Sequence, residues 1–129
     1  PERANFKLCD FGFAARPQPP MNMLRTRMGS PDTVAPEVVR GEMYAMPVDC
    51  WASGVLLFMS LSACPPFYAT SDVEVLRKVK QCNYQLEGGR WDSISAEAKD
   101  LVRRLMTFEP KNRLSAPKAL EHPFLKGRD

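Results

Sequence analysis

The sequence is poor in the residues from which metal sites are built. It has four cysteines, none in a Cys-x-x-Cys pair, and a single histidine, His122. Because structural zinc sites use closely spaced cysteines and histidines, this pattern argues against one. We interpret the thiols as isolated and buried in a reducing compartment, which predicts a cytoplasmic protein; they belong to Cys9, Cys50, Cys64 and Cys82.

A large excess of one charge and a long hydrophobic run are also absent. The 18 basic and 15 acidic residues leave a net charge of +3, and no basic stripe is interleaved with aromatics, so we expect no nucleic-acid partner. The uncharged stretch that begins at Cys50 meets Pro65 after 15 residues. A bilayer needs ~20, so this stretch predicts a buried core helix and no membrane span. Residues 1–5 lack signal-peptide organisation and an initiator methionine, as expected for a piece of a longer protein.

The remaining composition is typical of a globular chain of about one domain, with 129 residues, 44% of them hydrophobic and 26% charged. Residues 6–8 alternate apolar and basic side chains before Asp10-Phe11-Gly12, which predicts a short strand ending at a glycine turn. Residues 14–34 have no apolar period and contain four prolines. A loop of this length is either functional or a flexible surface segment, and the pattern alone leaves both open.

Capping residues and apolar periodicity predict four or five helices after this loop. Residues 48–63 are apolar on almost every side, which is typical of a helix buried inside a larger protein. The other predicted helices begin at a proline or a capping serine, and they run from Pro36 to Gly41, from Ser71 to Cys82, from Ser95 through Met106, and from Ser115 to before Pro123. Since one strand cannot satisfy its own edges, we expect missing sequence upstream.

Six short motifs follow one another along the chain. They are Asp10-Phe11-Gly12, Ala35-Pro36-Glu37, Asp49-Cys50-Trp51-Ala52-Ser53-Gly54, Pro65-Pro66-Phe67, and Arg113 in Glu109-Pro110-Lys111-Asn112-Arg113-Leu114, closed by Glu121-His122-Pro123-Phe124. The first two are common by themselves, as a turn and a helix start. Together and in this order, the motifs resemble those of the protein kinase family, over essentially the whole chain.

The resemblance implies a mostly α fragment, one short N-terminal strand followed by helices, of the α+β two-lobed protein kinase fold. Residues 1–129 would be a partial kinase domain, with the Asp-Phe-Gly strand and activation segment at 6–37 and the helical remainder of the large lobe at 36–125. The small lobe and the catalytic loop would lie upstream. Segments 7–14, 65–68 and 95–102 are similar to the calcium/calmodulin-dependent and calcium-dependent kinase group.

The family's Asp-Phe-Gly motif implies roles for three residues. Asp10 would be catalytic, holding the Mg²⁺ that bridges the ATP phosphates, since magnesium prefers carboxylate oxygens. Phe11 is expected to pack inward and Gly12 to give the turn its freedom, so that the three residues help to bind the cofactors Mg²⁺ and ATP. Magnesium there would neutralise charge during phosphoryl transfer.

Two residues of the loop are implied to act in regulation and substrate placement. Thr26, flanked by Arg25 and Arg27, occupies the family's activation-loop phosphosite, where a phosphate could order the loop; the alternative is an unmodified threonine. Ser30 stands where the family has a threonine that faces the protein substrate, and it retains the hydroxyl.

Three further residues are implied to be structural. Glu37 and Arg113 would form a buried ion pair, with two independent surface charges as the alternative. Asp49 would hydrogen bond to the backbone of the catalytic loop, or else be an ordinary carboxylate at a helix N-terminus.

The implied function is that of a fragment of an ATP-dependent serine/threonine kinase, which transfers the γ-phosphate to protein Ser or Thr. The fragment is expected to be inactive alone, because it has no glycine-rich loop, no Val-Ala-Ile-Lys lysine and no His-Arg-Asp. The alternative is a pseudokinase or scaffold. Expected partners are a protein substrate and, outside this chain, calmodulin or a calcium-sensing segment. Ala63 departs from the family's common glycine, and we expect exposed apolar surface.

Overall fold

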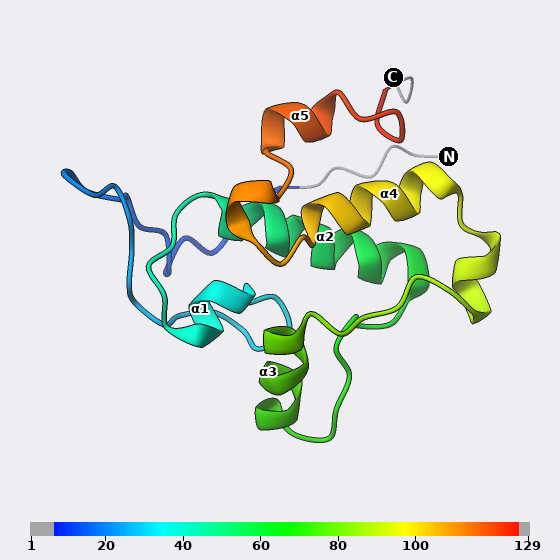
Figure 1. Ribbon diagram of the computed structural model, residues 1–129, viewed down its shortest axis with the longest axis horizontal. Helices are drawn as coiled ribbons and strands as arrows, with labels where there is room; N and C mark the ends of the chain where they lie inside the picture. The colour runs from blue at the N-terminus through cyan, green and yellow to red at the C-terminus, as the bar shows by residue number, and fades with distance from the viewer. Residues whose placement is uncertain (1–6, 127–129) are drawn as a thin grey trace.

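The computed structural model describes residues 7–126, which form helices joined by loops (Figure 1). The elements are α1 (Pro36–Arg40), α2 (Pro47–Ser62), α3 (Asp72–Gln81), the 3₁₀ helix η1 (Gly89–Ser93), α4 (Ala96–Leu105), the 3₁₀ helix η2 (Pro110–Asn112) and α5 (Ala116–Leu120). The prediction of a mostly helical chain is therefore confirmed. None of the helices in this range has the length and apolar character needed to cross a membrane.

The predicted N-terminal strand is not formed by the residues that the structure describes. Phe6 lies outside them, and Lys7 and Leu8 are exposed and irregular. Pairing of the β type within residues 7–126 is confined to two isolated antiparallel bridges, Gln18 with Met23 and Leu24 with Tyr44. A strand needs a neighbour that offers a ladder of N–H and C=O groups, and Lys7 and Leu8 have no such neighbour in this range.

Helix α2 is the centre of the molecule. In Figure 1, α4 lies along one side of α2, and α1 and α3 lie on the other. Trp51, Val55 and Phe58 project from α2 into the main core and are at most 4% exposed. Trp51 stacks on Phe67 with ring centroids 6.1 Å apart, and Phe58 packs on Trp91 at 4.6 Å. The prediction of a core helix at residues 48–63 is therefore confirmed for this face of α2, whereas Leu56, which is 55% exposed, shows that the helix is not covered on every side.

A glycine on α2 allows α4 to approach closely. A Cβ atom built on Gly54 would lie 2.7 Å from Met106 Cγ and 2.8 Å from Leu105 Cβ, closer than non-bonded atoms can sit. Gly54 is the last residue of the Asp-x-Trp-x-x-Gly motif, so the motif's spacing has a packing reason. Trp51 and Gly54 lie one helical turn apart, and both are buried.

Serine caps were predicted for three helices and are present at two. Ser71 Oγ accepts from Glu74 N at 3.4 Å, and Ser95 Oγ accepts from Ala98 N at 3.2 Å. The prediction for Ser115 is wrong: it precedes α5, but its side chain makes no capping hydrogen bond. Pro117 removes the second amide of α5, but the third belongs to Lys118, so the proline alone does not explain the missing cap; Ser115 contributes only its main-chain carbonyl, which accepts from Ala119 N at 2.8 Å.

The four cysteines are free thiols, but the prediction that all are buried is wrong. Cys9 and Cys64 are exposed, and Cys50 and Cys82 are half-buried. Cys9 belongs to the exposed N-terminal segment, and Cys64 follows the end of α2, where Ala63 adopts a left-handed conformation with φ 58°. Burial raises the pKa of the Cys82 thiol, which disfavours its reactive thiolate.

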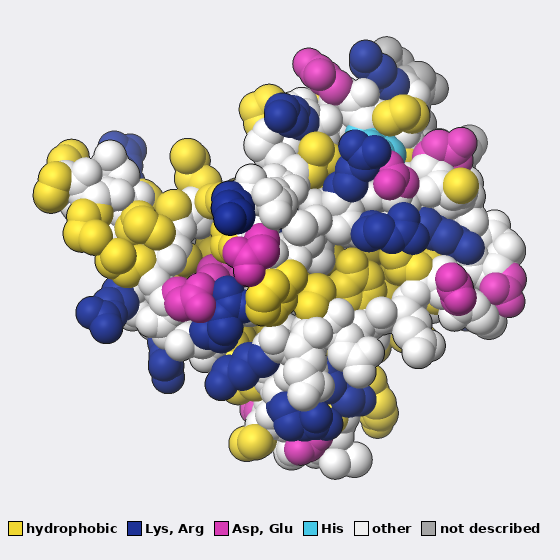
Figure 2. Space-filling view, viewed as in Figure 1, with side chains coloured by type: hydrophobic (Ala, Val, Ile, Leu, Met, Phe, Trp, Pro, Cys, Tyr) yellow, Lys and Arg dark blue, Asp and Glu magenta, His cyan; other side chains and the backbone are white. Residues whose placement is uncertain are grey.

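Exposed apolar side chains gather on the N-terminal part of the chain, as expected for a fragment of a larger fold. Figure 2 shows them on the loop that projects from the helical body, where Met21 is 60% exposed and Met23 is 40% exposed. Other large apolar side chains that are more than 40% exposed include Leu8, Phe11, Phe13, Met28, Met43 and Met46.

Candidate functional site

Asp10 presents its carboxylate to solvent on a tight turn. Its backbone is left-handed, with φ 61°, a conformation that aspartate tolerates better than most residues. The Gly12 amide donates to Asp10 Oδ1 at 3.4 Å, which closes a local turn of the Asx type. The glycine turn predicted after Asp10 is therefore present. No group of three or more His, Cys, Asp or Glu residues within 7–126 could hold a metal ion, so Asp10 can offer only a single ligand.

The prediction that Phe11 packs inward is wrong for the described chain. Phe11 is 64% exposed and Phe13 is 68% exposed. The apolar core is built around α2, and neither phenylalanine belongs to its buried clusters. A ring becomes buried only where other apolar atoms surround it, and residues 7–126 leave most of Phe11 uncovered.

The loop holds Thr26 and Ser30 in different ways. Both residues are exposed. The carbonyl of Thr26 accepts a hydrogen bond from the Tyr44 hydroxyl at 2.6 Å, across 18 positions of sequence. The carbonyl of Ser30 accepts from Thr33 N at 3.1 Å and from Val34 N at 3.0 Å, which forms the turn that leads into α1. Tyr44 was not predicted, because nothing in its local sequence marks a partner so far away.

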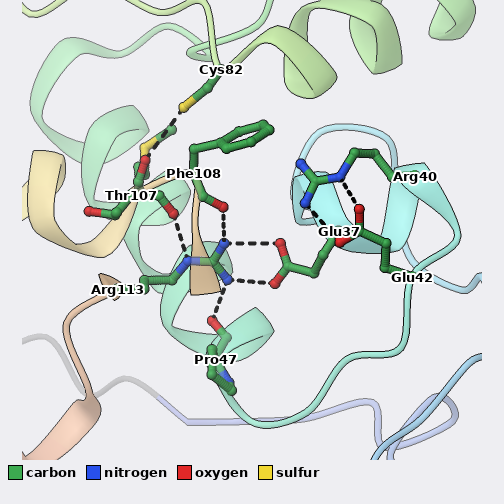
Figure 3. A network of polar contacts seen from close by, with 9 residues as sticks. Glu37, Arg40, Glu42, Pro47, Cys82, Thr107, Phe108 and Arg113 are labelled. Carbon is green, nitrogen blue, oxygen red and sulfur yellow. Dashed lines mark hydrogen bonds and ion pairs between the residues drawn. The ribbon is translucent and has the colours of Figure 1, made fainter. Parts of the chain in front are cut away.

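Glu37 and Arg113 form a buried bidentate ion pair (Figure 3). Arg113 Nη1 lies 2.7 Å from Glu37 Oε1, and Nη2 lies 3.0 Å from Oε2. The remaining three N–H groups of the guanidinium donate to the carbonyls of Thr107, Pro47 and Phe108 at 2.9, 2.9 and 3.2 Å. All five donors of Arg113 are thus satisfied, so the pair is complete although both side chains are at most 2% exposed.

The Glu37–Arg113 pair joins motifs that are distant in sequence. Glu37 lies in the first turn of α1 and Arg113 directly follows η2, 76 positions later. The guanidinium of Arg113 also lies over the Trp51 ring, with its Cζ 5.2 Å from the centroid. Since Trp51 stacks on Phe67, four of the six sequence motifs meet at this point.

A second arginine, Arg40 at the end of α1, adds contacts at the same junction. Arg40 lies over the ring of Phe108 at 4.4 Å, the residue whose carbonyl receives Arg113. Arg40 also binds Glu42 through contacts of 2.6 and 2.9 Å. This hydrogen bonding raises the pKa of Arg40 and lowers the pKa of Glu42. Helix α1 is therefore held to the segment before Arg113 by two different arginine contacts.

Asp49 is exposed in the first turn of α2, and the structure does not bring it to another predicted site residue. Within the described residues its carboxylate makes no hydrogen bond, while its main-chain carbonyl accepts from Ser53 Oγ at 2.8 Å. The position favours a negative charge, because the N-terminal amides of a helix carry partial positive charge. Its bond to a catalytic loop stays a prediction.

His122 closes the C-terminal end of the fold through a partner that was not predicted. Its Nε2 lies 3.0 Å from Asp100 Oδ2, and its Nδ1 accepts from Phe124 N at 3.2 Å. Since Nδ1 accepts a hydrogen bond, the proton is on Nε2 and points to Asp100. The hydrogen bond from His122, with nearby Arg104, lowers the pKa of Asp100. Asp100 was missed because its own helix gives no sign of a partner 22 positions away.

Comparison with known proteins agrees with this arrangement of motifs. The profile of the family described as "Protein kinase domain" matches residues 1–125. Calcium-dependent protein kinase 3 of Plasmodium berghei (strain Anka) is 42% identical over 120 residues, which cover 93% of this chain and 22% of that protein. Calcium/calmodulin-dependent protein kinase type II subunit delta of Oryctolagus cuniculus is 36% identical over 125 residues, covering 97% and 24%. The chain spans about a quarter of the length of these relatives.

Proposed function

Because the chain belongs to the protein kinase family, in the calcium-dependent and calcium/calmodulin-dependent group that its motifs resemble, we propose that it works as the later half of the large lobe of a serine/threonine kinase. The complete enzyme would transfer the γ-phosphate of ATP to Ser or Thr of a protein substrate. The observation that carries this proposal is the carboxylate of Asp10, which is retained and is exposed on its turn. A protein that served only as a scaffold would have no need of it.

The residues around Asp10 fit one part of a magnesium site. Magnesium takes one or two carboxylates and keeps several waters, so an exposed carboxylate with one oxygen outside the turn suits it. Magnesium bound there would neutralise charge on the ATP phosphates. The chain's own contribution is to orient the carboxylate, which the Gly12 amide does by holding Oδ1.

The described chain alone is proposed to be inactive. Asp10 is one carboxylate, and the sequence has no glycine-rich loop, no phosphate-binding lysine motif and no His-Arg-Asp. These parts would come from the remainder of the kinase. Protein substrates are proposed to lie along the segment from Thr26 to Glu37, with Ser30 helping to place the acceptor peptide and Thr26 as the regulatory phosphosite.

Calcium control and a cytoplasmic location are also proposals. Calcium appears in the names of both relatives and calmodulin in one of them, so we propose that a calcium-sensing or calmodulin-binding segment outside this chain controls the activity. Two of the four free thiols are exposed, which is compatible with a reducing compartment such as the cytoplasm.

The test is phosphoryl transfer by the intact protein carrying Asp10→Asn. The substitution removes the charge but keeps the shape, so we expect kcat to fall at least ~100-fold, because metal coordination contributes several kcal/mol to the transition state. Asp72→Asn is the matched control, since Asp72 is an exposed acid outside the segment proposed to bind the substrate, and it should keep near-normal kcat.

Two results would contradict the enzyme proposal. One is an intact protein that transfers no phosphate with Asp10 in place, which would favour the pseudokinase or scaffold alternative. The other is equal activity of the wild type and the Asp10→Asn variant, which would leave Asp10 without a catalytic role.

A further inference from the structure

The N-terminal segment is attached to the helical body at one place. Within the described range, three hydrogen bonds join residues 7–29 to the rest of the chain, and all three involve Tyr44. Almost every residue of the segment is exposed. Its conformation near Thr26 therefore depends on this one attachment more than on packing.

The attachment combines a main-chain pair with a side-chain bond. Leu24 N donates to Tyr44 O at 2.7 Å, and Tyr44 N donates to Leu24 O at 2.8 Å. The Tyr44 hydroxyl then reaches two residues further and donates to Thr26 O at 2.6 Å. Three bonds over Leu24 to Thr26 fix the backbone on both sides of Arg25, while the Thr26 side chain stays exposed.

The next residue, Arg27, lies against the C-cap of α1. Gly41 ends that helix with φ 76°, and a Cβ atom built there would collide with Nη2 of Arg27 and lie 2.9 Å from its Cζ. The absence of a side chain at position 41 leaves the space that the guanidinium occupies. Tyr44 and Gly41 both belong to the connection between α1 and α2. This connection therefore contacts the N-terminal segment at Leu24, before Thr26, and at Arg27, after it.

We propose that Tyr44 is a positioning residue, which holds the segment from Leu24 to Arg27 on the α1–α2 connection and so presents Thr26 and the loop that follows it. It touches no substrate atom and acts through the Thr26 backbone. The attachment through Tyr44 does not depend on the chain having kinase activity. Its consequence for catalysis, weaker use of the protein substrate when the hydroxyl is lost, rests on the proposed kinase function.

The first test is Tyr44→Phe in the intact protein, which removes the hydroxyl and keeps the ring. Tyr68→Phe is the control, because Tyr68 is 72% exposed and its hydroxyl makes no hydrogen bond in the described structure. We expect tryptic cleavage after Arg25 and Arg27 to rise about five-fold, because losing one net hydrogen bond raises the population of the detached segment by about that factor. Cleavage after Arg90, an exposed residue of η1, provides the internal reference and should not change.

A second variant tests the attachment without touching the tyrosine. Leu24→Pro removes the amide that donates to Tyr44 O, and Met21→Pro is its match, since Met21 is exposed and its N–H makes no hydrogen bond in the described range. Leu24→Pro should raise cleavage after Arg25 and Arg27, whereas Met21→Pro, which leaves both cleavage sites and the Tyr44 attachment intact, should not. Unchanged cleavage in both Tyr44→Phe and Leu24→Pro would overturn the proposal.

Kinetics then separate this inference from the kinase proposal. In an active intact enzyme, Tyr44→Phe should raise KM for the protein substrate about five-fold and leave KM for ATP unchanged. Increased cleavage without any kinase activity in the wild type would support the positioning role and reject the kinase function. Increased cleavage with an unchanged KM for the protein substrate would overturn the catalytic consequence.

Discussion

The helical body and the N-terminal loop differ in how they accommodate their key polar side chains. In the body, Arg113 is buried and each of its N–H groups has an acceptor within the same chain. In the loop, the residues that would do chemistry or receive a modification, Asp10 and Thr26, are exposed. The body thus supplies every acceptor that Arg113 needs, whereas the loop offers groups for something else to bind. Stability and function therefore depend on different residues.

The largest expected effect on stability comes from breaking the buried ion pair. Arg113→Met would leave the Glu37 carboxylate buried without its partner and remove the contact with Trp51. We expect the free energy of unfolding to fall by about 3–5 kcal/mol, measured by urea denaturation of the intact protein. Arg103→Met, an exposed arginine of α4, should cost less than ~1 kcal/mol. Equal losses of unfolding free energy in the two variants would show that the buried Glu37–Arg113 pair stabilises the fold no more than an exposed arginine does.

The next effect comes from the close approach of α2 and α4. Gly54→Ala places a methyl group against Met106 and Leu105, so the two helices must move apart. We expect a loss of about 1–3 kcal/mol by the same measurement, as for other overpacked cores. Ser53→Ala changes the neighbouring, exposed position and should have a smaller effect. A Gly54→Ala protein as stable as the wild type would mean that the two helices are not in close contact.

A smaller effect is expected from the pH dependence of the Asp100–His122 contact. The folded protein lowers the pKa of Asp100 from its ordinary 3.8, so the contact adds stability above that pH. This contribution is lost as the pH falls through the lowered folded value. Because Asp100 is 38% exposed, the change should stay below about 1 kcal/mol.

Thermal unfolding between pH 7 and pH 3 measures this contribution. Asp100→Asn should lose less stability on acidification than the wild type, whereas Glu97→Gln, an exposed residue of the same helix, should follow the wild type. If Asp100→Asn and the wild type lose stability in parallel, the carboxylate is not the group whose protonation matters.

Local signals in the sequence predicted most of the body. Proline at Pro36, glycine at Gly41 and the serines at Ser71 and Ser95 mark helix ends by chemistry that lies within one turn. The family resemblance placed Glu37 opposite Arg113, which no periodicity could do. The missing side-chain cap at Ser115 shows the limit of such rules, since the residue type alone does not fix the direction of the hydroxyl.

The features that were missed or wrongly predicted depend on tertiary contacts. Tyr44 and Asp100 each have a partner 18 or more positions away, and neither partner is marked in the local sequence. The burial of Phe11 and the strand near Lys7 both need neighbouring chain that residues 7–126 do not supply. The loop, where local rules say least, is thus where sequence and structure differ most.

Amide hydrogen exchange of the intact protein tests the contrast between body and loop most directly. We predict strong protection for the amides of α2 and α4, little protection through residues 11–23, and intermediate protection at Leu24 and Tyr44, each of whose amides donates to the carbonyl of the other. Slow exchange throughout residues 11–23, equal to that of α2, would contradict the account, because the loop would then be part of the stable body.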